Sequence, residues 1–312
     1  MTRNLTHGAR NQARLFLCWG LLLSGSAHAG LNFCDRAQQL TPGQQDLLFR
    51  FAGIIKSELE LSGASSALLA RSGLNLSRFD QRYSHAGISL RASENGPWSV
   101  RQLYYACDEK RPRIFDQGMT GFVLGAENPG QSFISVLLLP LAATEAMSHS
   151  AADRRQALAP LSPVYSANAY AYSTRYQNCN QWLIELLAQA WGGPFKEDGP
   201  GPRVSAQQWL HEQGYQPTLI QAGPLADIAG WIPWLHTDDH PAQAVIDRRF
   251  EVSMPASIEQ FVRSRYPETR RIEFCRKGRD VVIRRGWTPL GDDCQAQVLD
   301  EHIVLDETRP VR

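Results

Sequence analysis

The sequence lacks the short motifs that identify several large enzyme classes. No Gly-x-Ser-x-Gly turn, phosphate-binding loop or dinucleotide fingerprint occurs in its 312 residues. It also lacks an excess of either charge, with 32 lysines and arginines against 31 acidic residues. Its net charge therefore gives no reason to expect a nucleic-acid partner. No repeat, heptad run or low-complexity tract is present, so the chain is expected to be globular.

Long apolar runs are also missing. The unbroken run Leu15–Leu23 follows a basic lead with three arginines and precedes the small residues of Ala27-His28-Ala29. This pattern is typical of a secretory signal peptide, whereas a membrane helix needs roughly 20 apolar residues. We expect cleavage near Ala29 and a periplasmic or secreted, soluble protein without a transmembrane segment. Removal of residues 1–29 changes the formal charge from +1 to about −2.

Cysteine is scarce, and its count is informative. Five of the six cysteines remain after removal of the leader. In an oxidising compartment an odd number leaves one thiol unpaired. Cys275 and Cys294 flank a hairpin-like segment and are the easiest pair, and Cys34 with Cys107 could form the other. Cys179 is then the free thiol; five reduced cysteines are the alternative.

Turn residues and apolar periodicity predict an α+β fold, with an antiparallel sheet packed against helices. A first helix opens at Thr41-Pro42, and an amphipathic helix covers 181–191. We expect residues 30–312 to form one domain with an irregular C-terminal extension and a final hairpin. The other expected segments are strands at 67–70, 83–90, 98–105 and 133–139, helices at 144–159 and 205–213, a core at about 38–265, and the extension at about 266–312.

Cys179 lies at the start of the amphipathic helix that covers 181–191. Asn178 is a good N-cap, and Gln181 follows three residues later as in a capping box. Unpaired first-turn amides and the helix dipole stabilise a thiolate. With a histidine nearby, this position predicts a thiol pKa lowered from about 8.5 to roughly 4 to 7. A small core cysteine is the alternative for the same position.

A nucleophilic thiol needs a base, and His85 is the candidate. Among the histidines of the mature chain, it is the one inside a predicted strand, beside Gly87, which leaves room for another backbone or a substrate to approach. Alternation in the next strand places Gln102 where its carbonyl can accept the imidazole N–H and set the tautomer. Arg101 and Tyr104 are rival candidates for that role. A half-exposed strand histidine without a catalytic role is the alternative.

Two further stretches carry weaker signals. His236-Thr-Asp-Asp-His240 has metal-ligand residue types, but it lies in a proline-flanked loop without a second cluster, which favours a polar surface turn. Ile228–Leu235 is an apolar loop with two tryptophans, which covers the core or acts as a lid. We therefore expect no metal and no other cofactor.

The two motifs resemble those of a known group. Ser84-His85-Ala86-Gly87-Ile88 and Asn178-Cys179 are similar to the histidine and cysteine motifs of circularly permuted papain-like proteins, among them permuted NlpC-type hydrolases and lecithin:retinol acyltransferase-like enzymes. The resemblance implies a permuted papain-like fold with Cys179 as nucleophile, His85 as general base and Gln102 as the third polar residue. The chain also resembles an uncharacterised secreted family of Gram-negative bacteria (DUF2145-like), which brings no known activity.

The resulting hypothesis is an exported thiol hydrolase or acyltransferase that acts on an amide or ester. An envelope location makes cell-wall peptides the first substrate class and lipid acyl groups the second. The competing class is a non-catalytic envelope binding or scaffold protein that uses the same cleft. The oligomeric state does not follow from these patterns.

Overall fold

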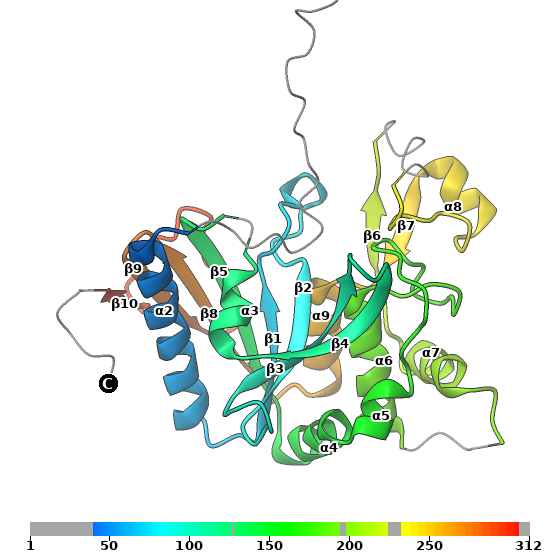
Figure 1. Ribbon diagram of the computed structural model, residues 1–312, viewed down its shortest axis with the longest axis horizontal. Helices are drawn as coiled ribbons and strands as arrows, with labels where there is room; N and C mark the ends of the chain where they lie inside the picture. Colours follow the sequence, from blue (N-terminus) through cyan, green and yellow to red (C-terminus); the bar gives the residue numbers. More distant parts are fainter. Residues whose placement is uncertain (1–39, 127, 194–197, 224–231, 306–312) are drawn as a thin grey trace, which may run out of the picture. The chain divides into compact units, whose positions relative to one another are not determined.

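The computed structural model describes residues 40–126, 128–193, 198–223 and 232–305, and its elements form an α+β fold (Figure 1). The expected signal peptide and Cys34 lie outside these ranges. The strands are β1 (Ser66–Arg71), β2 (His85–Leu90), β3 (Ser99–Ala106), β4 (Arg111–Gln117), β5 (Gln131–Leu138), β6 (Thr218–Gln221), β7 (Arg249–Val252), β8 (Arg270–Lys277), β9 (Asp280–Arg285) and β10 (Glu301–Val304). The helices are α2 (Pro42–Leu61), α3 (Met119–Leu124), α4 (Leu141–Ala152), α5 (Arg154–Leu158), α6 (Cys179–Gly192), α7 (Pro202–Glu212), α8 (Ala242–Asp247) and α9 (Pro255–Arg265).

The main sheet has eight strands in the order β10-β9-β8-β5-β1-β2-β3-β4, and a second, two-stranded sheet pairs β6 with β7. Neighbouring strands of the main sheet run antiparallel. In the centre, β1 pairs with β2 so that Arg71 lies opposite His85. The antiparallel sheet expected from the sequence is confirmed.

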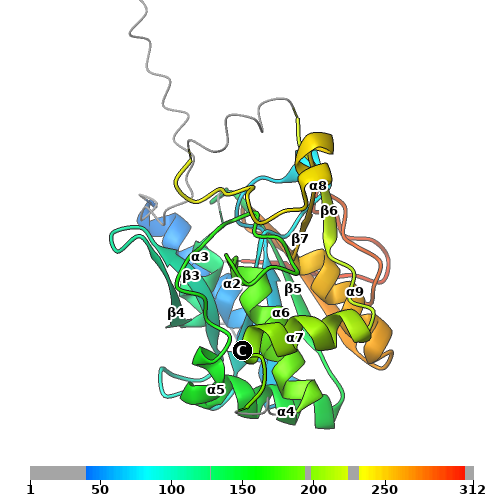
Figure 2. The ribbon, with the colours of Figure 1, turned by 90° about the vertical axis from the view of Figure 1, so that its right-hand side faces the viewer.

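Helices cover both faces of this sheet (Figures 1 and 2). On one face, Leu69 of β1 packs in a core cluster with Phe51 of α2 and Phe122 of α3. Because side chains alternate along a strand, the neighbouring positions of β1 face the other side, where α4 contacts β1 and α6 contacts β2 and β3. Burial on both sides explains why every residue of β1 and β2 is buried.

Two helices begin at the capping residues expected from the sequence, and one predicted helix is divided into two by a cap that was not expected. Thr41 forms a capping box with Gln44 at the start of α2, and Asn178 accepts a hydrogen bond of 2.7 Å from the backbone N–H of Gln181 at the start of α6. The single helix predicted at 144–159 is wrong, because the backbone is extended at Asp153. The Asp153 side chain instead caps a separate helix, α5, by accepting from Gln156 N at 2.8 Å.

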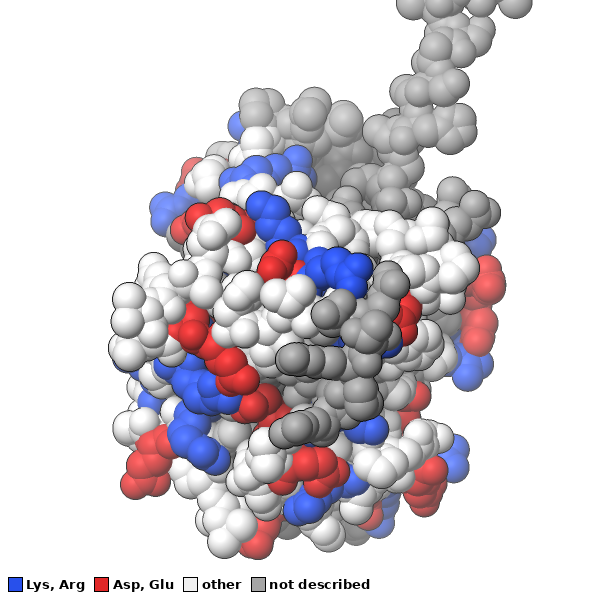
Figure 3. All heavy atoms as spheres, turned by 90° about the vertical axis from the view of Figure 1, so that its left-hand side faces the viewer, with Lys and Arg blue, Asp and Glu red and all other residues white. Residues whose placement is uncertain are grey.

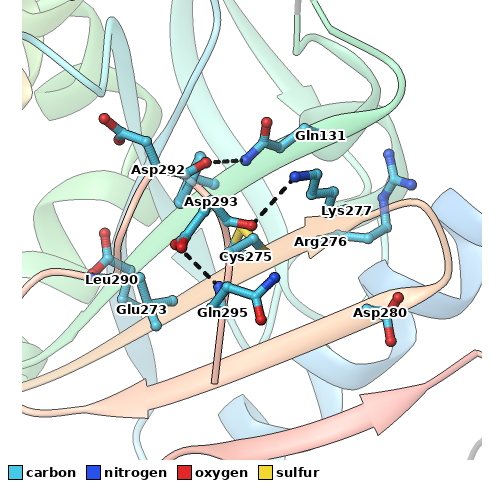
Figure 4. The surroundings of a disulfide bond; sticks show 12 residues. Gln131, Glu273, Cys275, Arg276, Lys277, Asp280, Leu290, Asp292, Asp293 and Gln295 are labelled. Atoms are coloured by element: carbon cyan, nitrogen blue, oxygen red, sulfur yellow. Dashed lines mark hydrogen bonds between the residues drawn. A yellow bond between two sulfur atoms is a disulfide. The ribbon is translucent and has the colours of Figure 1, made fainter. Parts of the chain in front are cut away.

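The C-terminal part is more regular than predicted. The expected hairpin is present as β8 and β9, but β8 also pairs with β5 and so extends the main sheet. The predicted Cys275–Cys294 disulfide is present and joins β8 to the segment after β9 (Figure 4). Cys107 is also disulfide-bonded, and its predicted partner lies outside the described residues. Cys179 is a free, buried cysteine.

The described surface and helices agree with the composition. On the face that Figure 3 shows, acidic and basic side chains are interspersed rather than gathered by sign. Within the four described ranges, no helix is both long enough and apolar enough to cross a membrane.

Candidate active site

Cys179 is the first residue of α6, and its side chain is 8% exposed. The backbone amides of Asn180 and Cys179 and the hydroxyl of Tyr165 act on the sulfur and favour its thiolate form. Tyr165 is itself buried, and its ring lies 5.2 Å from that of Tyr105 on β3. The thiol therefore lies at a helix start, as expected, next to polar donors and to the aromatic pair of Tyr165 and Tyr105.

The protonation state of this thiol differs from the sequence-based expectation. Burial raises the pKa of the Cys179 thiol to about 11, although the backbone amides, the charge of Arg71 and the hydroxyl of Tyr165 all favour the thiolate. The predicted lowering of the pKa is wrong because desolvation outweighs these local contributions. In the unliganded protein the sulfur is a neutral thiol at physiological pH.

His85 and Gln102 are brought together by adjacent strands. The imidazole Nε2 lies 2.7 Å from Gln102 Oε1. Gln102 Nε2 donates at 2.8 Å to Gln117 Oε1 on β4, which turns the carbonyl oxygen of Gln102 toward the ring. His85 Nε2 must then donate, so Nδ1 carries the lone pair of the neutral ring. A glutamine can thus set the tautomer of His85 without adding charge.

Gly87 allows this approach. A Cβ atom there would lie 2.7 Å from Val100 Cγ1, 2.8 Å from the carbonyl oxygen of Arg101 and 3.1 Å from Gln102 Cβ. Only a residue without a side chain fits so close to β3. The close backbone approach expected beside His85 is confirmed.

Aromatic rings enclose the imidazole of His85. Tyr104 stacks on it with ring centroids 4.8 Å apart, and Phe122 lies at 6.3 Å. Burial, and to a smaller extent the charge of Arg71, lower the pKa of His85 to about 3 against the opposing effect of the hydrogen bond to Gln102. At neutral pH the ring is therefore uncharged, with its lone pair on Nδ1.

The cysteine helix and the histidine strand are joined next to these residues. Asn180 Nδ2 donates at 3.1 Å to the carbonyl oxygen of Ser84, and α6 contacts β2 from the face of the sheet opposite to the His85 side chain, which faces Phe122 of α3. Within the described part of the chain, however, no hydrogen bond connects the Cys179 thiol to the His85 ring. The catalytic role of the Cys179, His85 and Gln102 set stays a prediction.

A buried ionic network supports the start of α6. Glu185 of α6 is fully buried and pairs with Arg203 of α7 at 2.8 Å. Arg203 also donates to the carbonyl oxygens of Thr174 and Tyr176, and Gln177 donates to Glu185 at 2.6 Å. The network fixes the segment that leads into Cys179, and its residues did not stand out in the sequence.

Arg71 was also missed by sequence reasoning. It is 4% exposed and lies opposite His85 in the β1–β2 register, which places both side chains on one face of the sheet. Its Nη2 donates at 2.7 Å to the hydroxyl of Tyr104, the residue that stacks on His85. An arginine at the end of an apolar strand was the available signal.

The remaining candidates lie elsewhere or have other partners. Arg101 forms an ion pair with Asp116 at 2.5 Å, whereas Tyr104 contacts His85 by stacking. His236 stacks on a tyrosine ring, and His240 Nε2 lies 2.8 Å from the carbonyl oxygen of Asn168. The described residues contain no group of three or more potential metal ligands. Residues 224–231, with half of the apolar tryptophan loop, lie outside the described ranges.

Comparison with known proteins gives the family. A model described as an uncharacterized protein conserved in bacteria (DUF2145) matches residues 58–262, so the chain belongs to this family. The match includes Cys179, His85, Gln102 and Arg71, and it ends before β8. No curated protein and no solved structure matches the chain.

Proposed function

We propose that this DUF2145 protein is a thiol-dependent hydrolase or acyltransferase with a permuted papain-like arrangement. The observation that carries the proposal is the oriented His85–Gln102 pair, together with the hydrogen bond that joins the residue before His85 to the first turn of the Cys179 helix. Nucleophilic catalysis by a cysteine needs a thiol that can be activated and a base with a set tautomer. The signal-like leader and the disulfides support an exported location.

The reaction would begin from a neutral pair, because the Cys179 thiol and the His85 ring are both uncharged at neutral pH. As the sulfur attacks the carbonyl carbon of an amide or ester, His85 Nδ1 takes the thiol proton. The C–N or C–O bond then breaks, and the imidazolium returns the proton to the leaving group. A thioester on Cys179 remains, and water or an acceptor group releases it.

The developing oxyanion would be stabilised at the helix start. The backbone amides of Cys179 and Asn180 and the hydroxyl of Tyr165 already surround the sulfur. These donors are held in place before the reaction, so they stabilise charge without reorganisation. Closure of the Cys179–His85 gap is expected when substrate binds, since catalytic hydrogen bonds often tighten only in the complex.

A non-catalytic binding protein is the second candidate. The raised pKa of the thiol and the lack of a hydrogen bond between Cys179 and His85 among the described residues favour it. In that case the cleft would bind its ligand without forming a covalent bond. The two candidates differ in one measurable property, which is acyl transfer to sulfur.

Reaction with p-nitrophenyl acetate tests the proposal without knowledge of the natural substrate. We expect a burst of nitrophenol equal to the protein concentration and an acetyl adduct at Cys179 by peptide mass spectrometry. The burst should disappear in Cys179→Ser and slow by at least about tenfold in His85→Gln, as for loss of a general base. An equal acylation rate in wild type and His85→Gln would refute the enzyme, and absence of any adduct would favour the binding protein.

A further inference from the structure

Arg71 carries a buried positive charge without a counter-charge in the described structure. Its side chain is 4% exposed, and within the four described ranges no carboxylate forms an ion pair with it. Removing a guanidinium from water is costly unless an anion or a full set of acceptors replaces the water. Arg271, by contrast, is equally buried and pairs with both Glu259 and Glu273.

The hydrogen-bonding capacity of this guanidinium is largely unused. Nη2 donates to Tyr104, but Nε and Nη1 have no acceptor among the described residues, although both are shielded from solvent. The rings of Phe122 and Tyr104 lie 5.5 and 5.9 Å from Cζ and compensate only part of the lost hydration. A buried polar group that stays unsatisfied needs an explanation, and a missing ligand is one.

The position of Arg71 next to His85 indicates that one ligand contacts Arg71, His85 and Cys179. Arg71 and His85 are cross-strand neighbours, and Tyr104 contacts both. The charge of Arg71 also acts on both partners, since it lowers the pKa of the His85 ring and that of the Cys179 thiol. An anion that neutralised Arg71 would lie beside His85 on the α3 face of the sheet, at the strand end where Asn180 of α6 is bonded to Ser84.

The backbone around the guanidinium leaves little room. A Cβ atom on Gly125 would lie 2.3 Å from Arg71 Cζ, so the main chain lies directly against the guanidinium there. A small planar anion matches such a narrow space and the flat guanidinium better than a tetrahedral dianion does.

We propose that Arg71 binds a carboxylate group of the substrate that Cys179 attacks, so that the substrate is an acidic peptide or a similar amide or ester with a free carboxylate near the scissile bond. The inference rests on the proposed function and chooses between its two substrate classes, because a neutral lipid ester carries no such group. The covering backbone at Gly125 must shift slightly when the carboxylate enters.

Two reagents that alkylate the same sulfur test this directly. Iodoacetate carries a carboxylate and iodoacetamide a neutral amide, and in both the thiolate displaces iodide and forms one C–S bond. We would compare the ratio of their rate constants at Cys179 with the ratio for 2-mercaptoethanol at the same pH. Wild type should favour iodoacetate by roughly tenfold or more relative to the reference thiol, as one charge-assisted contact implies.

The variants identify the residue responsible. Arg71→Gln should return the ratio to that of 2-mercaptoethanol, and Arg71→Lys should retain part of the preference. Arg91→Gln removes the same charge at the other end of β2 and should leave the ratio unchanged. Arg71→Gln should keep its melting temperature or raise it, because it removes an unpaired buried charge.

Several outcomes would overturn the inference. These are a wild-type ratio equal to the reference, a preference that persists in Arg71→Gln, and an equal slowing of both reagents in Arg71→Gln, which would make Arg71 a partner of the thiolate. If neither reagent alkylates Cys179 in the folded protein, the carboxylate-binding role of Arg71 is also excluded. Protection of Cys179 by inorganic phosphate but not by acetate would indicate a phosphate site instead.

The test is separable from that of the proposed function, because alkylation requires neither turnover nor His85. An Arg71-dependent ratio together with no acetylation by p-nitrophenyl acetate would leave a carboxylate-binding site in a non-catalytic protein. Acetylation with an unaltered ratio would leave the enzyme and remove the carboxylate preference.

Discussion

The side-chain amide of Asn180 donates a 3.1 Å hydrogen bond to the main-chain carbonyl of Ser84, across 96 residues of sequence. Asn180 follows Cys179 and Ser84 precedes His85, so this one bond connects the two proposed reacting residues through their neighbours. The hydroxyl of Ser84 also accepts from the backbone N–H groups of Gly73 and Leu74, at 3.1 and 2.9 Å. The segment before His85 is thereby held to both α6 and the end of β1.

Replacing Asn180 with alanine should loosen this connection. We expect the free energy of unfolding to fall by about 1 kcal/mol, the net value of one partly buried hydrogen bond, and acetylation of Cys179 to slow. Urea denaturation and the nitrophenol burst measure the two effects. Asn95→Ala is the matched control, because Asn95 donates at 2.9 Å to Asp116 on the surface. Equal effects of the two substitutions would contradict a special role for Asn180.

The pH dependence of alkylation should follow the raised pKa of Cys179, about 11. Only the thiolate reacts, so the rate with iodoacetamide should rise by about tenfold per pH unit between pH 7 and pH 10 without a plateau. The folded state favours the neutral thiol. The resulting contribution to the free energy of unfolding is present below the pKa of the unfolded thiol and is lost as the pH rises from that value toward 11. A plateau below pH 7 would show that an ion pair with His85 forms without substrate.

His85 should make the protein sensitive to acid. Its pKa of about 3 in the folded state lies below the ordinary value of 6.5, so between these values the unfolded chain binds more protons and stability falls as pH falls. Between pH 7 and pH 4 the wild type should lose about 3 kcal/mol more unfolding free energy than His85→Gln. The exposed His149 supplies the control, and His149→Gln should lose as much as wild type. The same loss in His85→Gln would argue against a buried neutral ring.

The Cys275–Cys294 disulfide should contribute to stability rather than to chemistry. It closes a loop with a sequence separation of 19, and chain-entropy estimates for such a loop give about 3 kcal/mol. The double variant Cys275→Ser/Cys294→Ser should lose about that amount in urea denaturation. Because a reductant would also affect Cys107, substitution is the cleaner experiment. Loss of acetylation at Cys179 in a still folded double variant would assign the hairpin a part in the site.

Elements with strong local signals were predicted well. Thr41-Pro42 and Asn178 begin helices because their caps satisfy amides within the same short segment. Other elements carry no such signal. β4 alternates charged and apolar residues at low burial, and it exists because it pairs with β3 along its whole length. The break at Asp153 was missed because a helical pattern continues on both sides of it.

The proposed site also contains residues that the sequence predicted and residues that it did not. Strand alternation placed Gln102 on one face of its strand but left Arg101 and Tyr104 as rivals. The pairing of β2 with β3 then brings Gln102, rather than Arg101, to the imidazole Nε2. The residue that lies opposite His85 on β1, on the other side of β2 from β3, was not predictable from the sequence. Arg71 reaches this position through the pairing of β1 with β2, and the fact that none of the described carboxylates pairs with it depends on the segments packed around it.

The sequence by itself determined that Cys179 opens a helix, that Cys275 pairs with Cys294, and that His85 lies on a strand beside a close backbone approach. These properties depend on neighbours along the chain or on short hairpins. Only the tertiary structure decided the charge of Cys179 and His85, the two proposed reacting groups. Helix amides act within one turn and favour the thiolate, but desolvation depends on every segment that covers the sulfur, and it raises the pKa of Cys179 instead.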